Sequence, residues 1–259
     1  MNADQSSSNT DRSAFLKPFW TRTFGPSWVV SLLLMILLGG VRYVAVFSPY
    51  PAQALFFLQY AGAWFAPFVI LTTNGRYQIG LHERGATAAN MALAALAGAA
   101  YGLITFGLGM VLYGDSPENW CVTLRDYLRL IELRGVMPPI GVFALFAVPA
   151  ILFAPLADEI LFRGFIQTAF TRSWNPYVAT AVNCASFGIT YLYFHAIWSD
   201  AAGLHIHLVS GGIALALFTG LGLLFTMIRL YTGTLWTAVA AHAGFNLMLI
   251  GVAIFVYMR

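Results

Sequence analysis

The sequence predicts an all-α polytopic membrane protein with about seven or eight transmembrane helices. The first observation is composition: the 259-residue chain is 59% hydrophobic and 9% charged, whereas soluble domains carry about 25% charged residues. The second is that its apolar residues gather into stretches of roughly 20, the length that a helix needs to cross a bilayer. The net charge of +3 is spread over loops, so the sequence has no basic stripe typical of nucleic-acid binding.

The apolar stretches divide the chain into three regions. Residues 1–26 are expected to be a disordered tail, because their first half is polar and lacks periodicity. Residues 27–139 are expected to hold the first membrane helices and an amphipathic loop, and residues 140–257 a core of later helices. The stretches run over residues 28–47, 52–73, 88–113, 140–171, 177–198, 206–228 and 235–257.

The fourth stretch is predicted to be broken. It is longer than one span requires, and Pro149 and Pro155 interrupt it. Proline lacks a backbone N–H and clashes with the preceding turn, so a new half-helix is expected to begin near Pro155, with Asp158 and Glu159 close to its positive end. Irregular backbone at membrane depth faces protein or water, which predicts that this segment borders a cavity.

Basic residues predict the orientation of the chain. Lys17, Arg76, Arg84, Arg172 and Arg229 fall on one side if the spans alternate. The positive-inside rule makes that side cytoplasmic and predicts a multi-pass protein of the cell (inner) membrane with a cytoplasmic N-terminus.

Three ionisable residues lie inside the fourth stretch. Glu159 and Arg163 are four apart, so they share a helical face and are expected to form an ion pair. Asp158 points about 100° away from them. It needs a partner on another helix or a proton, because an unpaired charge in hydrocarbon costs several kcal/mol. Arg42, near the end of the first stretch, is expected to snorkel.

Two later stretches add polar groups at helical spacing. His195 follows Tyr191 by four residues, and Asn246 follows His242 by four. With Asp158 they form the set of groups that a hydrolytic site needs, namely a carboxylate and an imidazole to deprotonate water and neutral donors to hold an oxyanion. Taken singly, each His or Asn also fits an interhelical hydrogen bond, and the Glu159–Arg163 pair fits a structural role.

The ordered motifs D-E-x-x-x-R-G at 158–164, Y-x-x-x-H at 191–195 and H-x-x-x-N at 242–246 resemble the CPBP intramembrane proteases, also called the Abi or CAAX-protease family. The resemblance covers about residues 140–250. It implies an active site inside the helical bundle and an endopeptidase that acts on membrane-embedded or membrane-anchored peptides in the lipid bilayer.

The family pattern also implies roles for individual residues. Asp158, the first acidic residue of the motif, and His195 are expected to activate water, with Glu159 as the second acidic residue. His242 and Asn246 are expected to hold the oxyanion, and Arg163 and Tyr191 to support the site. A metal-free mechanism is favoured because Asn246 is a poor zinc ligand; zinc bound by His195, His242 and Glu159 is the alternative.

Two positions depart from the family pattern. Asp158 replaces the usual glutamate and shortens the reach by about 1.5 Å, and Tyr191 replaces the usual phenylalanine and adds a hydroxyl that can orient His195. Restoring glutamate at residue 158 is therefore expected to raise activity in a poorly active enzyme. The aspartate also motivates a second hypothesis, a catalytically impaired membrane scaffold that binds a partner protein. A small transporter ranks last, because the polar groups cluster in the late stretches.

Overall fold

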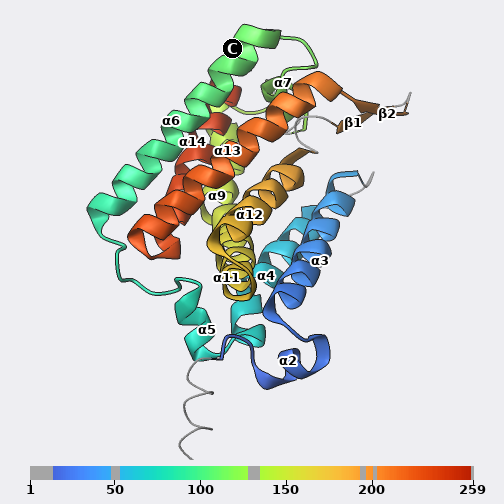
Figure 1. Cartoon of the computed structure of the whole chain (residues 1–259). Helices are drawn as coiled ribbons and strands as arrows, with labels where there is room; N and C mark the ends of the chain where they lie inside the picture. The colour runs from blue at the N-terminus through green and yellow to red at the C-terminus, as the bar shows by residue number, and fades with distance from the viewer. Residues whose placement is uncertain (1–13, 48–52, 128–134, 193–196, 201–202, 258–259) are drawn as a thin grey trace, which may run out of the picture.

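The computed structural model describes residues 14–47, 53–127, 135–192, 197–200 and 203–257. Within these ranges the chain forms a bundle of helices with one short strand hairpin (Figure 1). The predicted class, a helical membrane protein, is confirmed.

The N-terminal half of the described chain contributes the helices α2 (Pro18–Phe24), α3 (Ser27–Phe47), α4 (Gln53–Ile70), α5 (Thr73–Gln78), α6 (Ala88–Tyr113) and α7 (Trp120–Tyr127). The C-terminal half contributes α9 (Pro139–Leu152), α10 (Ala154–Glu159), the π-helix η1 (Ile160–Ile166), α11 (Gln167–Ser173), α12 (Pro176–Tyr191), the strands β1 (Ile197–Asp200) and β2 (Gly203–Ile206), α13 (Leu208–Thr232) and α14 (Leu235–Tyr257).

Five helical segments of the described chain are long and apolar enough to cross a membrane: Ser27–Ala45, Ala88–Tyr113, Pro139–Ser173, Leu208–Thr232 and Leu235–Val256. The expected seven or eight spans are not confirmed. Two predicted spans are short as described, because α4 has 18 residues with Pro67 inside it and α12 has 16 residues. At 1.5 Å per residue, α12 reaches about 24 Å of the roughly 30 Å of hydrocarbon.

The fifth apolar stretch does not continue as a helix to residue 198. Residues 197–200 form β1, which pairs antiparallel with β2 from Ile197 opposite Ile206 to Asp200 opposite Gly203. Ile and Trp favour strands, and Ser, Asp and Gly favour turns. Hydropathy alone hid this change, because strand-forming residues are as apolar as those of a membrane helix.

The N-terminal segment differs from the expected disordered tail over residues 14–26. Phe15 and Leu16 are buried, and Leu16 pairs with Leu71 in an isolated β-bridge beside α2. These two apolar side chains anchor a segment whose remaining residues gave no periodic signal. Residues 1–13 lie outside the described chain.

The segment from α9 to α11 runs through the middle of the bundle, and every residue from 157 to 170 is buried. It contacts α3 and α4 on one flank and α12 and α14 on the others. Helix α6 packs along α14 on the outside of the bundle (Figure 1). Residues 157–170 therefore face protein on all sides.

The ends of α5, α11 and α13 meet at one end of the bundle. Arg172 donates to the side chain of Gln78 at 2.7 Å, and Arg229 donates to the backbone carbonyl of Gln78 at 3.0 Å. Figure 1 shows α2 and α5 at this end and the strands at the opposite end. The basic residues used for the orientation thus share one end, and its assignment to the cytoplasm stays a prediction.

Candidate active site

The predicted break lies immediately before Asp158 and Glu159. Helix α9 ends at Leu152, Phe153 is a turn residue, and α10 begins at Ala154. Pro155 has no N–H for the carbonyl of residue 151, so the helical hydrogen-bond ladder is interrupted there. The expected half-helix near Pro155 is confirmed, and it continues into the π-turn of η1, a feature that often occurs at functional sites.

Asp158 is fully buried and is held by two side chains from other helices. Arg42 of α3 forms a bidentate ion pair with it, in which Nη2 bonds to Oδ1 and Nη1 lies 3.3 Å from Oδ2. The hydroxyl of Tyr191 donates to Oδ2 at 2.5 Å. The prediction that Arg42 snorkels is wrong: it is 3% exposed and also donates to Gln59 of α4 at 3.2 Å. A buried carboxylate within reach attracts a guanidinium more strongly than the distant interface does.

Glu159 forms a second, separate ion pair. Arg163 Nη1 lies 3.2 Å from its Oε1, which confirms the pair expected from their spacing. Arg163 also donates to the carbonyl of Gly222 at 2.8 Å and lies 4.3 Å from the ring centre of Phe187. The two adjacent carboxylates therefore point in different directions, each toward its own guanidinium.

His242 connects the two carboxylates. Its Nδ1 lies 2.9 Å from Glu159 Oε1, and its Nε2 lies 3.3 Å from the hydroxyl oxygen of Tyr191. An ionised carboxylate only accepts hydrogen bonds, so Nδ1 carries a proton when Glu159 is ionised. The four side chains Asp158, Tyr191, His242 and Glu159 thus form one continuous buried chain of contacts, which we call the carboxylate–histidine chain.

The structure places Asn246 apart from this chain. Its amide donates to the carbonyl of Ala150 at 2.8 Å, next to the break between α9 and α10. One carbonyl of the interrupted ladder thereby gains a donor, so Asn246 ties α14 to the break. His195 lies outside the described residues, and α12 brings Tyr191, four residues earlier, to the level of His242.

The two carboxylates have fixed positive charges as neighbours. Within the described chain, no three His, Cys, Asp or Glu side chains lie close enough together to hold one. Asp158 and Glu159 each face a guanidinium, and a fixed positive charge at a ligand opposes the binding of a divalent cation. The described donors of the suggested zinc site, Glu159 and His242, already bond to each other.

The sequence reasoning missed two residues of this site, Arg42 and Gln59. Arg42 did carry a signal, because it is the only charged residue between residues 27 and 47. A carboxylate without a local partner and a lone arginine in another span are natural partners. Gln59 carried no comparable signal, since a single glutamine in an apolar helix has many possible partners.

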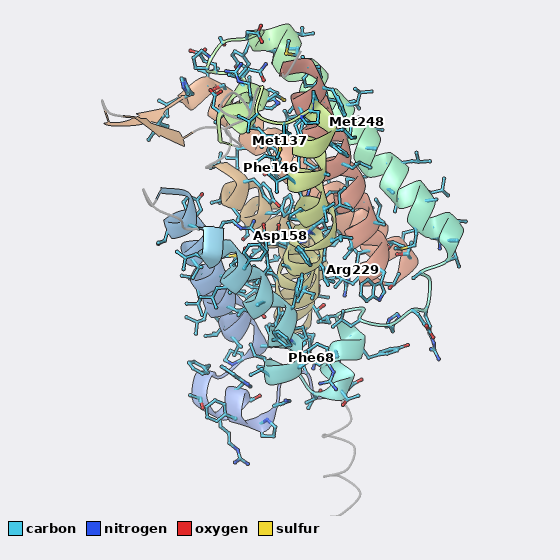
Figure 2. The ribbon with its side chains drawn as sticks, turned by 180° about the vertical axis from the view of Figure 1, so that it is seen from behind. Phe68, Met137, Phe146, Asp158, Arg229 and Met248 are labelled. Carbon is cyan, nitrogen blue, oxygen red and sulfur yellow. The ribbon has the colours of Figure 1, made fainter. Side chains whose placement is uncertain are left out.

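Figure 2 shows Asp158 at mid-height of the bundle, with Met137 and Phe146 toward one end and Phe68 and Arg229 toward the other. Asp158 thus lies between the two ends of the bundle, and Asp158, Glu159 and His242 are fully buried. Ionisable side chains buried inside a membrane bundle commonly belong to a functional site, because burying charge there is costly.

Comparison with known proteins agrees with the motifs. Residues 140–248 match the family model described as type II CAAX prenyl endopeptidase, Rce1-like. No curated protein and no solved structure matches the chain. The matched range contains the three motifs at 158–164, 191–195 and 242–246, whereas α3 and α4 lie outside it. Residues 140–248 are therefore similar to the CPBP family of CAAX-type proteases.

Proposed function

We propose that the protein is an intramembrane endopeptidase that hydrolyses a peptide bond of a membrane-associated protein or peptide. The observation that carries the proposal is the carboxylate–histidine chain, buried at mid-height of a membrane bundle in a segment that matches a protease family. Charged groups inside a membrane bundle are energetically costly and therefore rare, and those that occur commonly serve a function.

In the proposed reaction, Asp158 and His195 take a proton from water, and the water oxygen attacks the carbonyl carbon of the scissile bond. The carbonyl oxygen becomes an oxyanion that Asn246 and His242, the latter protonated on both ring nitrogens, stabilise by donating hydrogen bonds. The proton is then transferred to the amide nitrogen and the C–N bond breaks, which yields a carboxylate and an amine. Asn246 has a second amide hydrogen for this role besides the one given to Ala150.

The contacts of Asp158 leave it able to accept a water molecule. An ionised carboxylate offers about four acceptor positions, of which Arg42 uses two and Tyr191 one. The remaining position is on Oδ1. Glu159 has the supporting task of fixing the ring of His242 through Nδ1, which turns Nε2 toward the reacting groups.

The metal-free mechanism is the one we propose. Its support is the donor set itself, since Arg42 and Arg163 supply the positive charge beside Asp158 and Glu159 that a zinc ion would otherwise supply. A zinc ion bound by Glu159, His242 and His195 would have to displace the Glu159–His242 bond, and this alternative predicts zinc in purified, active protein.

Substrates are proposed to be membrane-embedded or membrane-anchored peptides that reach the site from the lipid bilayer. The support is the position of Asp158 at mid-height of a bundle whose described helices include five that are long and apolar enough to cross a membrane (Figure 2). We propose the cell membrane as the location, with a cytoplasmic N-terminus, from the positions of the basic residues.

One observation favours a second candidate, the impaired scaffold that binds a membrane partner. Most acceptor positions of Asp158 are already occupied by Arg42 and Tyr191, which leaves little of its carboxylate free to bind a water molecule. This hypothesis predicts that substitution of Asp158 or His195 leaves the biological effect of the protein unchanged.

The deciding experiment is cleavage of a co-expressed library of membrane-anchored peptides, with metal content measured on the same purified preparations. Wild type is compared with Asp158→Ala, His195→Ala and the controls Asp126→Ala and His207→Ala. Asp126 is about half exposed on α7, at 52%, and His207 lies before α13. Loss of cleavage in the two site variants alone, in zinc-free protein, supports the proposal. Equal behaviour of site and control variants would contradict it.

A further inference from the structure

Arg42 is a charged group of the site that lies outside the family-matched segment. It belongs to α3, 116 residues before Asp158 in the sequence, and is 3% exposed. Its guanidinium is held on three sides, by Asp158 of α10, by Gln59 of α4 and by the ring of Tyr191 at 5.6 Å. A side chain with this many fixed contacts has a defined position relative to Asp158.

The geometry of the pair is suited to orienting a carboxylate. The planar guanidinium meets both carboxylate oxygens, an arrangement that fixes the direction as well as the distance of the acid. Tyr191 then adds a third bond on Oδ2. Together these contacts leave one acceptor position of Asp158, on Oδ1, which is where a catalytic water would bond to it.

Charge gives a second argument. Asp158 and Glu159 are adjacent and both fully buried, and like charges so close together are unfavourable unless each is compensated. Glu159 is compensated by Arg163 of its own helix. Asp158 has its compensation from Arg42, so the segment 140–248 does not contain the whole site.

We propose that Arg42 is the positioning residue of Asp158: it aims the short carboxylate at the catalytic water. This inference rests on the proposed function for its kinetic consequence. It goes beyond that function because it extends the site to α3 and α4. It also means that a residue from the N-terminal half of the chain sets the position of the Asp158 carboxylate.

A purely structural reading makes Arg42 a tie between α3 and α10. The structural role and the positioning role predict different results for Arg42→Lys, which keeps the charge and the buried pair but loses the bidentate geometry. A structural tie needs mainly the charge. A positioning role needs the geometry, since a misplacement of about 1 Å in an active site can cost about 10²-fold in rate.

The experiment compares Arg42→Lys with Arg229→Lys, a matched change of another arginine whose hydrogen bonds go to Gln78 and Thr168. For Arg42→Lys we expect kcat to fall about 10²-fold with KM and the melting temperature nearly unchanged, and for Arg229→Lys no change in kcat. Equal kcat in both variants, or a loss of kcat that only follows a loss of stability, overturns the proposal.

A second readout does not need proteolysis. The fluorine NMR signal of fluorotyrosine at residue 191, assigned by its absence in Tyr191→Phe, reports the position of Asp158 through the 2.5 Å bond between the two side chains. Because Arg42 also lies 5.6 Å from the centre of this ring, its direct effect on the signal is measured separately, by making Arg42→Lys in the Asp158→Ala background. The signal is expected to move further when Arg42→Lys is made in wild type than in that background, and to stay in Arg229→Lys. If wild type cleaves nothing, the larger movement in the presence of Asp158 still supports the positioning role, whereas equal movements overturn it.

Discussion

Gly98 of α6 offers a sharp test of how the bundle holds His242. A Cβ at this position would lie 1.7 Å from the carbonyl oxygen of Ala241 in α14, where ordinary contact begins at 3.4 Å. Because the obstacle is backbone, no side chain can rotate away, and α14 has to retreat by about 1.7 Å. Small residues at such crossings are what allow membrane helices to approach closely.

The displacement reaches the site because His242 follows Ala241 directly. Its Nδ1 lies 2.9 Å from Glu159 and its Nε2 3.3 Å from Tyr191, so a shift larger than 1 Å breaks one or both contacts. For Gly98→Ala we expect proteolysis to fall by about 10²-fold or more. Overpacking is also expected to lower the free energy of unfolding by about 1–3 kcal/mol.

The control is Gly107→Ala on the same helix, where a Cβ meets nothing within 4 Å. Replacing an unconstrained helical glycine by alanine stabilises by about 0.5–1 kcal/mol, so this variant is expected to be fully active and slightly more stable. Both variants are assayed for thermal unfolding in detergent and for cleavage of a peptide substrate. Equal stability and equal activity of the two variants would refute the reasoning.

Two further outcomes follow from other contacts. A Cβ at Gly222 would lie 3.2 Å from Arg163 Nη2, so Gly222→Ala is expected to lower the free energy of unfolding by about 1–2 kcal/mol. The control is Gly212→Ala on the same helix, where a Cβ meets nothing within 4 Å and no such loss is expected. Denaturant unfolding measures both variants. Burial raises the pKa of Cys121 from 9.0 to about 12, so its thiol is expected to resist alkylation in the folded protein at pH 9. The raised pKa also means that this thiol's contribution to stability is complete below pH 9 and is lost as the pH rises toward 12. Rapid alkylation of native protein at pH 9 would contradict the burial.

Local features of the site were predictable from the sequence because their causes are local. The Glu159–Arg163 pair follows from a spacing of four, and the pair is present at 3.2 Å even though η1 is a π-helix. The break before Asp158 follows from Pro155, whose missing N–H acts on its own helix. The three motifs also led to the family that the match over residues 140–248 confirms.

Features that depend on which helices become neighbours were not predictable. The partner of Asp158 is 116 residues away in the chain, and nothing in the apolar pattern says that α3 packs beside α10. Hydropathy also failed to separate strand β1 from helix α12, since both are apolar, and the seven or eight spans that it predicts are not confirmed by the described residues. The anchoring of Phe15 and Leu16 depends on a tertiary contact with Leu71.

Asp158 and Tyr191, the two residues that depart from the family pattern, lie next to each other and share one space. The Tyr191 oxygen lies 2.5 Å from Oδ2 of Asp158, whereas a glutamate would extend about 1.5 Å further. There is no room for that methylene while the hydroxyl is present. A short acid with a tyrosine and a long acid with a phenylalanine therefore fill the gap equally well, which means that the aspartate need not indicate lost activity.

This coupling reverses the expectation drawn from the family pattern alone. Asp158→Glu by itself should lower cleavage, because the longer acid is pushed out of line with Arg42. Asp158→Glu combined with Tyr191→Phe should recover it, with a coupling energy of about 1–3 kcal/mol in a double-mutant cycle. Tyr43→Phe, which removes a hydroxyl bonded to the carbonyl of Ile189, is the control and should rescue nothing. If Asp158→Glu alone raises the rate of cleavage, the carboxylate has space beyond the Tyr191 hydroxyl and the steric argument fails.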